Sequence, residues 1–78
     1  MLQVISFRKD PKDKNKVITR STKGGIRQRD NTSLFVAMQE WYTENKKKIA
    51  SIINIETTEY DGENGTVDYQ FRIWYLEK

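Results

Sequence analysis

Residues 67–76 read VDYQFRIWYL, and this stretch decides the fold that the sequence predicts. Apolar and polar side chains alternate along it, which is typical of a β-strand with one buried and one solvated face. The buried face is expected to hold Val67, Tyr69, Phe71, Ile73 and Tyr75. The solvated face is expected to hold Asp68, Gln70, Arg72, Trp74 and Leu76. An apolar partner must therefore cover one side of this strand.

A second strand is predicted just before it, at residues 51–60, where Ile and Thr are frequent. Ile53 and Ile55 are expected to extend the buried face. Between the two strands, the segment Asp61–Gly65 contains an Asp-Gly and an Asn-Gly pair. Such pairs supply the positive-φ residues of a tight turn, so the two strands form a hairpin.

A helix that packs on this hairpin is predicted from residue 33 to about residue 49. Apolar residues recur there at intervals of four and three, namely Leu34, Met38 and Trp41. Phe35 and Tyr42 lie on a neighbouring stripe and are expected to widen the buried face. Lys46–Lys48 is expected in the last turn, where cations meet the negative end of the helix dipole.

The first third of the chain predicts one strand and leaves a second open. Leu2–Phe7 is short, apolar and followed by a charged run, which indicates a strand and then a loop. Val17–Thr22 is rich in β-branched residues and either returns as a second strand or belongs to the loop. Gly24-Gly25 ends that segment, and the polar stretch Arg27–Ser33 offers N-cap residues for the helix.

The predicted fold class is therefore α+β: a small antiparallel sheet of three or four strands with one long helix on one face, in the order β-(β)-α-β-β. At 78 residues the chain has room for a single domain spanning 1–78. A basic loop or hairpin insert is expected at about 9–31.

Charge is polarised along the chain. Between Arg8 and Arg29 there are nine Lys or Arg residues and two Asp, whereas residues 30–78 carry five basic residues and nine carboxylates. A basic segment of this kind indicates an anionic partner. The absence of His and Cys excludes imidazole bases, thiolate nucleophiles and the usual zinc ligand sets. The remaining carboxylates form no evident catalytic or metal pair, so the protein is predicted not to be an enzyme and to need no cofactor.

The lack of Cys and His also affects which partners are expected, and the lack of a long apolar run affects the expected location. Without disulfides or a metal, a small core commonly gains burial by association with copies of itself. Trp74 and Leu76 on the solvated face are expected either to meet such a copy or to be covered by the basic loop. No apolar run is long enough to span a bilayer, and residues 1–7 lack the pattern of a signal peptide. We expect a cytoplasmic protein of a bacterial host cell.

The candidate binding site is an anion site around the Gly-Gly turn. Glycine allows backbone amides to approach an anion closely, a helix start offers further free amides, and an arginine fork can hold phosphate bidentately. The candidate phosphate-binding residues are Arg20, Lys23, Gly24, Gly25, Arg27 and Arg29. Tyr60 or Trp74 would stack a base, with Leu76 as a further interface residue. The pattern matches neither a Walker loop nor a dinucleotide fingerprint, and a solvated basic turn explains it equally well.

Nucleic-acid binding is a second interpretation of the same charges. The basic residues from Lys9 to Arg29 would follow a phosphate backbone, and exposed aromatic side chains would stack bases. Glu56 and Asp68 on the same sheet face count against this interpretation.

The opening strand Met1–Ile5, the single helix and the C-terminal hairpin ending in Phe71–Lys78 together resemble the very small β-α-β-β proteins of Bacillus-type bacteria and their phages, which include a small sporulation-associated protein. The resemblance implies the fold and a bacterial or phage setting and assigns no functional residue. The basic insert is longer than in those proteins. The resemblance, together with the missing catalytic residues and the basic charge, favours a phage or mobile-element protein that inhibits a bacterial defence pathway by binding, for example by sequestering a phosphate-bearing nucleotide messenger. The alternatives are a nucleic-acid-binding accessory protein, a direct protein inhibitor of a host enzyme and a structural sporulation protein.

Overall fold

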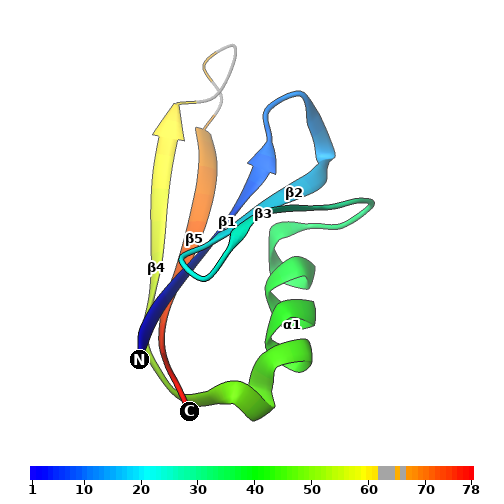
Figure 1. The fold of residues 1–78 in the computed structure, drawn as a ribbon. Coiled ribbons are helices and arrows are strands. Elements are labelled where there is room, and N and C mark those ends of the chain that lie inside the picture. Colours follow the sequence, from blue (N-terminus) through cyan, green and yellow to red (C-terminus); the bar gives the residue numbers. More distant parts are fainter. Residues whose placement is uncertain (62–64, 66) are drawn as a thin grey trace.

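A computed structural model of the chain describes residues 1–61, 65 and 67–78, and for residues 60 and 61 it describes the backbone alone. These residues form a β-sheet with a helix on one side (Figure 1). The elements in chain order are β1 (Leu2–Asp10), β2 (Asp13–Ser21), β3 (Gly25–Arg29), α1 (Leu34–Asn45), the 3₁₀ turn η1 (Lys46–Lys48), β4 (Ile49–Asp61) and β5 (Val67–Glu77). The predicted α+β class is confirmed.

The described part of the sheet has five strands in the order β3-β2-β1-β5-β4, and every neighbouring pair is antiparallel. β1 therefore lies at the centre of the sheet, between β2 and β5. Its register sets Ile5 opposite Ile73 and Phe7 opposite Phe71. These cross-strand pairs place apolar side chains on one common face, which is the face that α1 covers.

The strand that the sequence did not predict is β3. The sequence indicates a turn and an N-cap region at residues 24–33, because Arg27, Gln28 and Arg29 give no apolar alternation. In the structure this stretch pairs with β2, with Gly25 opposite Ser21 and Arg29 opposite Val17. An edge strand needs only backbone pairing on one side, and charged side chains are common there because they discourage further pairing.

The charged run after Phe7 was predicted to form a loop, but in the structure it belongs largely to two strands. β1 runs to Asp10 and β2 begins at Asp13, so a tight turn joins them. Asp10 accepts a hydrogen bond from the Lys12 N–H at 2.9 Å, and such Asx contacts stabilise turns. The hairpin alternative for residues 9–31 is therefore the observed one. The strand alternative for residues 17–22 is observed as well, because residues 17–21 form the second half of β2.

Helix α1 begins where Ser33 caps it and ends earlier than the sequence predicts. The Ser33 Oγ accepts the Val36 N–H at 3.3 Å, which satisfies one of the free amides of the first turn. The helix ends at Asn45, whose side chain donates to the Trp41 carbonyl at 2.8 Å. The predicted extent to residue 49 is wrong, because Lys46–Lys48 forms a separate 3₁₀ turn that leads directly into β4.

The core lies between α1 and the central strands, and its centre is Trp41. The Trp41 ring meets Phe7 edge-on at 6.0 Å between centroids and Tyr75 at 5.1 Å. This edge-to-face geometry is favourable for aromatic rings. The other buried apolar side chains of the core are Ile5, Val17, Leu34, Ala37, Ile49 and Ile73.

Burial is lost toward β4, against expectation. Ile53 and Ile55 were predicted to be buried, but their exposed fractions are 55% and 54%. Phe35 and Tyr42, predicted to widen the buried face of the helix, are also exposed. α1 lies over β1 and the strands beside it, so its apolar stripe does not reach the β4 edge. The alternation along β5 therefore gives full burial only at Ile73 and Tyr75.

Candidate functional site

A cavity of about 280 Å³ lies on the helix side of the sheet, between the β2–β3 hairpin, the C-terminal end of α1 and the end of β5. Its apolar wall includes Ile5, Trp41 and Tyr75, which belong to the core. Its polar wall includes four cations, Lys23, Arg27, Arg29 and Lys48, and one carboxylate, Glu77. The cavity therefore combines an aromatic wall with an excess of positive charge.

The sheet register explains why the β3 cations point into this space. Arg27 lies opposite Thr19 and Arg29 opposite Val17, and both partners on β2 are buried beneath α1. Opposed residues of an antiparallel pair share a face, so both arginines lie on the helix side. Lys23 and Gly24 form the turn that closes the same hairpin. The spacing of residues 23–29 thus gathers the predicted cluster at one cavity.

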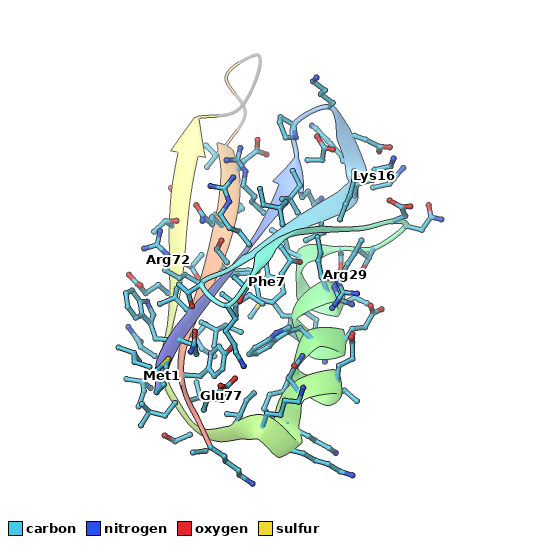
Figure 2. The ribbon with its side chains drawn as sticks, in the orientation of Figure 1. Met1, Phe7, Lys16, Arg29, Arg72 and Glu77 are labelled. Carbon is cyan, nitrogen blue, oxygen red and sulfur yellow. The ribbon has the colours of Figure 1, made fainter. Side chains whose placement is uncertain are left out.

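Arg29 is the cation most firmly engaged within the protein. Its guanidinium contacts Glu40 at 3.2 Å and Glu44 at 2.9 Å, and its side chain is only 17% exposed. The three groups join β3 to α1, as Figure 2 shows for Arg29 beside the helix. Because two carboxylates compensate its charge, Arg29 mainly connects the strand to the helix and is less available to bind phosphate.

Lys23 is also paired, in this case with Glu77 at the end of β5. The turn that carries Lys23 is held against β1, because the Thr22 Oγ donates to Gln3 Oε1 at 2.7 Å and the Thr22 N–H donates to the Val4 carbonyl at 3.1 Å. The Lys23 side chain is half exposed. It can thus exchange between Glu77 and an anion in the cavity.

The two glycines act differently from the prediction. Gly25 has φ +98° and Gly24 φ +159°, and a Cβ at either position would meet no atom within 4 Å. The space beside the turn is therefore open. The Gly24 N–H, however, already donates to the Ser21 carbonyl at 3.4 Å, so Gly24 does not offer the free backbone donor that the sequence suggested.

The strongest features for an incoming anion are Arg27, Lys48 and Thr19. Among the described residues, neither Arg27 nor Lys48 has an ion-pair partner, and both are exposed. Thr19 lines the cavity and is 5% exposed, and its Oγ has no hydrogen-bond partner among the residues that the structure describes. A buried hydroxyl without a partner costs free energy, and a polar ligand in the cavity would remove that cost.

Tyr75 adds a neutral hydroxyl to the wall. Burial raises the pKa of Tyr75, the charge of Glu77 raises it further, and Lys23 lowers it. The phenol is therefore protonated at neutral pH and can donate a hydrogen bond. Sequence reasoning did not assign Thr19, Lys48, Trp41 or Tyr75 to the site. A signal existed for Thr19 alone, as a polar residue on the inward-facing side of an alternating strand.

The helix end at this cavity is the opposite of the one expected. The sequence suggested that amides at the helix start near Ser33 would face the anion, but the cavity is lined by Trp41, Asn45 and Lys48 at the other end. That end carries the negative pole of the helix dipole. Lys48 in η1 offsets it, so the positive charge at the cavity comes from side chains and not from helix amides.

Three predicted residues lie away from the cavity. Arg20 pairs with Ser6 and Ile26 on the opposite face of the sheet. Trp74 lies on that face too, where its indole N–H donates to Glu56, and Leu76 is 37% exposed. The side chain of Tyr60 lies outside the described residues. The structure thus separates the candidate stacking group Trp74 from the Gly-Gly turn.

The opposite face, which we call the open face, has its own basic cluster. Arg20 on β2, Arg8 on β1 and Arg72 on β5 occupy three neighbouring strands there. Arg72 lies 3.8 Å from Glu56 and is marked away from α1 in Figure 2. A hollow of about 400 Å³ includes Ser6, Ile18 and Gln70 beside the first two arginines. The open face is therefore a second place where anions can bind.

Comparisons with known proteins found no matching protein family, curated protein or solved structure. Within the described residues, no helix is long and apolar enough to cross a membrane. The same part of the chain contains no group of three or more His, Cys, Asp or Glu side chains that could hold a metal ion. The candidate site therefore rests on its own geometry.

Proposed function

We propose that this protein is a non-enzymatic binding protein that captures a small phosphate-bearing molecule, of the nucleotide class, in the cavity beside the Gly-Gly turn. The observation that carries the proposal is the convergence of four cations and one carboxylate on a cavity with an aromatic wall. In it, Arg27 and Lys48 neutralise the phosphate, because neither is engaged within the described part of the protein.

The remaining groups suit the rest of such a ligand. Thr19 Oγ and the Tyr75 hydroxyl supply hydrogen bonds at the base of the cavity. Lys23 moves from Glu77 to the ligand when a stronger anion arrives. At about 280 Å³ the cavity is near the lower limit for small-molecule sites, so it favours a mononucleotide or one half of a larger cyclic nucleotide.

The biological setting we propose is a phage or mobile-element protein that neutralises a bacterial defence pathway by sequestering a nucleotide messenger. Support for it comes from the resemblance to very small β-α-β-β proteins, the basic charge of the first part of the chain and the lack of His and Cys. A sequestering protein needs affinity and abundance but no catalytic group.

The experiment that tests the cavity is calorimetric titration with orthophosphate, mononucleotides and cyclic dinucleotides, after mass spectrometry of the supernatant from denatured protein. The variant Arg27→Gln with Lys48→Gln should weaken binding at least tenfold, since a hydrogen bond to a charged group contributes about 1.5–3 kcal/mol. The matched control is Lys12→Gln with Lys14→Gln, which removes the same charge from the distal β1–β2 turn. Equal affinity in both double variants, or no heat with any of these molecules, overturns the proposal.

Nucleic-acid binding is a second candidate, and the open face favours it. Arg8, Arg20 and Arg72 lie on adjacent strands with Trp74 beside them, and this combination suits a phosphodiester backbone with one stacked base. Gel shifts at two salt concentrations with single-stranded DNA and RNA test it, with Arg20→Gln as the variant. Affinity should fall about one log unit per log unit of salt for each phosphate neutralised. Absence of a shift at low salt excludes this candidate.

A further inference from the structure

The helix side of the sheet is only half covered. α1 is about 10 Å wide, whereas the outer strands of a five-stranded sheet lie about 19 Å apart, so one helix leaves the β4 side open. The exposed apolar side chains left there form what we call the uncovered strip. It consists of Ile52, Ile55, Val67 and Tyr69 from the sheet with Phe35 and Tyr42 from the helix. Phe71, beside them on β5, is partly buried against the core.

The sheet members of the strip share the helix side because of the β4–β5 register. Ile55 lies opposite the buried Ile73, and Ile52 opposite the buried Tyr75. Val67 and Tyr69 precede Phe71 and Ile73 at alternate positions of β5, so they point to the same side. Their exposed fractions are 54% for Ile55, 46% for Tyr69 and 52% for Val67.

The helix members lie on the flank of α1 that faces away from β3. Glu40 and Glu44 mark the flank toward β3, because both contact Arg29. Phe35 and Tyr42 are placed on the other side of the buried stripe by the helical period of 3.6 residues. Phe35 is 64% exposed and Tyr42 47%. Both rings therefore border the uncovered part of β4 and β5.

The strip has opposite charges at its two ends. At one end η1 carries Lys46–Lys48, which leads into the start of β4. At the other end Glu59 lies opposite Tyr69, near the tip of the hairpin. Lys46, Lys47 and Glu59 are exposed and have no ion pair among the described residues. In Figure 1 these ends lie at the bottom and the top of the molecule.

We propose that the uncovered strip binds the same strip of a second copy of this chain, in a two-fold symmetric dimer. A two-fold axis through the middle of the strip turns its basic end onto the acidic end of the partner, so the surface is complementary to itself. This inference goes beyond the proposed function and does not depend on the cavity, which lies on the β3 side of α1.

The size of the strip agrees with this partner. An aromatic side chain offers about 200 Å², so the three half-exposed rings supply roughly 300 Å² per copy, and the aliphatic members add about as much again. The total is roughly 600 Å², close to the area of about 800 Å² per partner in a stable interface. Monomeric proteins rarely leave this much apolar area exposed on one side. The partner also supplies the burial that a 78-residue core lacks.

The test is the mass of the full chain in solution, measured by light scattering and by sedimentation over a range of concentrations. A dimer has twice the 9.3 kDa of the chain. Ile55→Glu should raise the dissociation constant at least tenfold. The matched control is Ile26→Glu on β3, because Ile26 is exposed to a similar extent, at 62%, but lies outside the strip. Both sites are exposed, so both variants should keep the wild-type circular dichroism.

A charge exchange tests the two-fold arrangement itself. Glu59→Lys should weaken the dimer, and Lys46→Glu with Lys47→Glu should weaken it as well. Combining all three changes should restore the wild-type dissociation constant to within about threefold, because each basic end again meets an acidic one. A wild-type monomer at all concentrations overturns the proposal. A dimer that tolerates Ile55→Glu, or that the combined charge exchange does not restore, overturns it too.

Discussion

The two halves of the helix side of this sheet differ although their sequences look alike. Over β1 and β2, inward side chains such as Phe7 and Val17 are fully buried beneath α1. Over β4, side chains of equal hydrophobicity, such as Ile55, remain half exposed. The comparison teaches that alternation specifies which side of a strand is apolar, whereas the position of the covering helix decides which of those residues are buried.

The position of α1 is set by contacts beneath it and at one flank. Trp41 packs between Phe7 and Tyr75 beneath the helix, and Glu40 and Glu44 hold Arg29 of β3 at its side. The aromatic contacts set the helix over β1 and β5, and the ion pairs with Arg29 hold its flank on the β3 side. The β4 half is left uncovered as a result, and the candidate cavity forms where the helix end meets the β2–β3 hairpin.

The largest expected change in stability distinguishes the covered half from the uncovered half. Trp41→Ala removes the central ring of the covered half and should lower the free energy of unfolding by about 3–5 kcal/mol. Ile55→Ala in the uncovered half should change it by about 1 kcal/mol or less. Urea unfolding followed by circular dichroism measures both, at a concentration where the chain is monomeric. Similar losses for the two variants would show that the β4 half is as buried as the other.

Some features of this fold can be predicted from the sequence and others cannot, and the difference has a physical reason. The alternation of residues 67–76, the four-and-three spacing of Leu34, Met38 and Trp41, and the α+β class depend on local periodicity, so they are predictable. β3 was missed because its pairing is made by backbone groups, which a list of side chains does not reveal. The exposure of Ile55 was missed because lateral coverage is a tertiary property.

The candidate site divides in the same way. Lys23, Gly24, Gly25, Arg27 and Arg29 meet at one cavity because they are neighbours in sequence on one hairpin. Lys48 and Tyr75 join them from distant segments, and no local pattern indicates this. Arg20 and Trp74 lie on the open face because alternate residues of a strand point to opposite faces. Which face each residue takes is known only once the register of β2 and β5 is known.

The second largest effect is expected at the hairpin that borders the covered half. Gly25 has φ +98°, a conformation that side chains rarely adopt, although a Cβ there would meet no atom within 4 Å. Gly25→Ala should therefore destabilise through backbone strain alone, by about 1–3 kcal/mol. Gln28→Ala, on the same strand, is the control: it removes one exposed hydrogen bond to Asp10 and should cost about 0.5 kcal/mol. Thermal unfolding compares them, and an unchanged Gly25→Ala variant would mean that the turn adopts another conformation.

A smaller loss of stability is expected when the ion pairs between Arg29 of β3 and the helix α1 are removed. Arg29→Met keeps the aliphatic stem but removes both contacts to Glu40 and Glu44, which are each about half exposed. Exposed pairs contribute about 0.2–1 kcal/mol each, so the expected loss is roughly 1 kcal/mol and should shrink in high salt. Arg27→Met removes an equal charge from the same strand and should have almost no effect on stability. Equal losses for the two variants would contradict the structural role given to Arg29.

The smallest effect concerns Tyr75, which lies where the covered half ends and the cavity begins. Burial, reinforced by the charge of Glu77, raises the pKa of Tyr75 above its ordinary value of 10.0. The unfolded chain therefore ionises this phenol at a lower pH than the folded chain does. The resulting stability is fully present below pH 10 and is lost as the pH rises from there through the raised pKa.

Tyr75→Phe removes that dependence, so the difference in unfolding free energy between the wild type and this variant should stay constant up to about pH 10 and then shift against the wild type. Unfolding in urea at a series of pH values from neutral to strongly alkaline measures it. Tyr42→Phe is the matched control at a concentration where the chain is monomeric, because Tyr42 is 47% exposed on the uncovered side. Parallel stability curves for the wild type and Tyr75→Phe across this range would mean that the Tyr75 hydroxyl is as solvated as that of Tyr42, and the boundary between the two halves would then lie elsewhere.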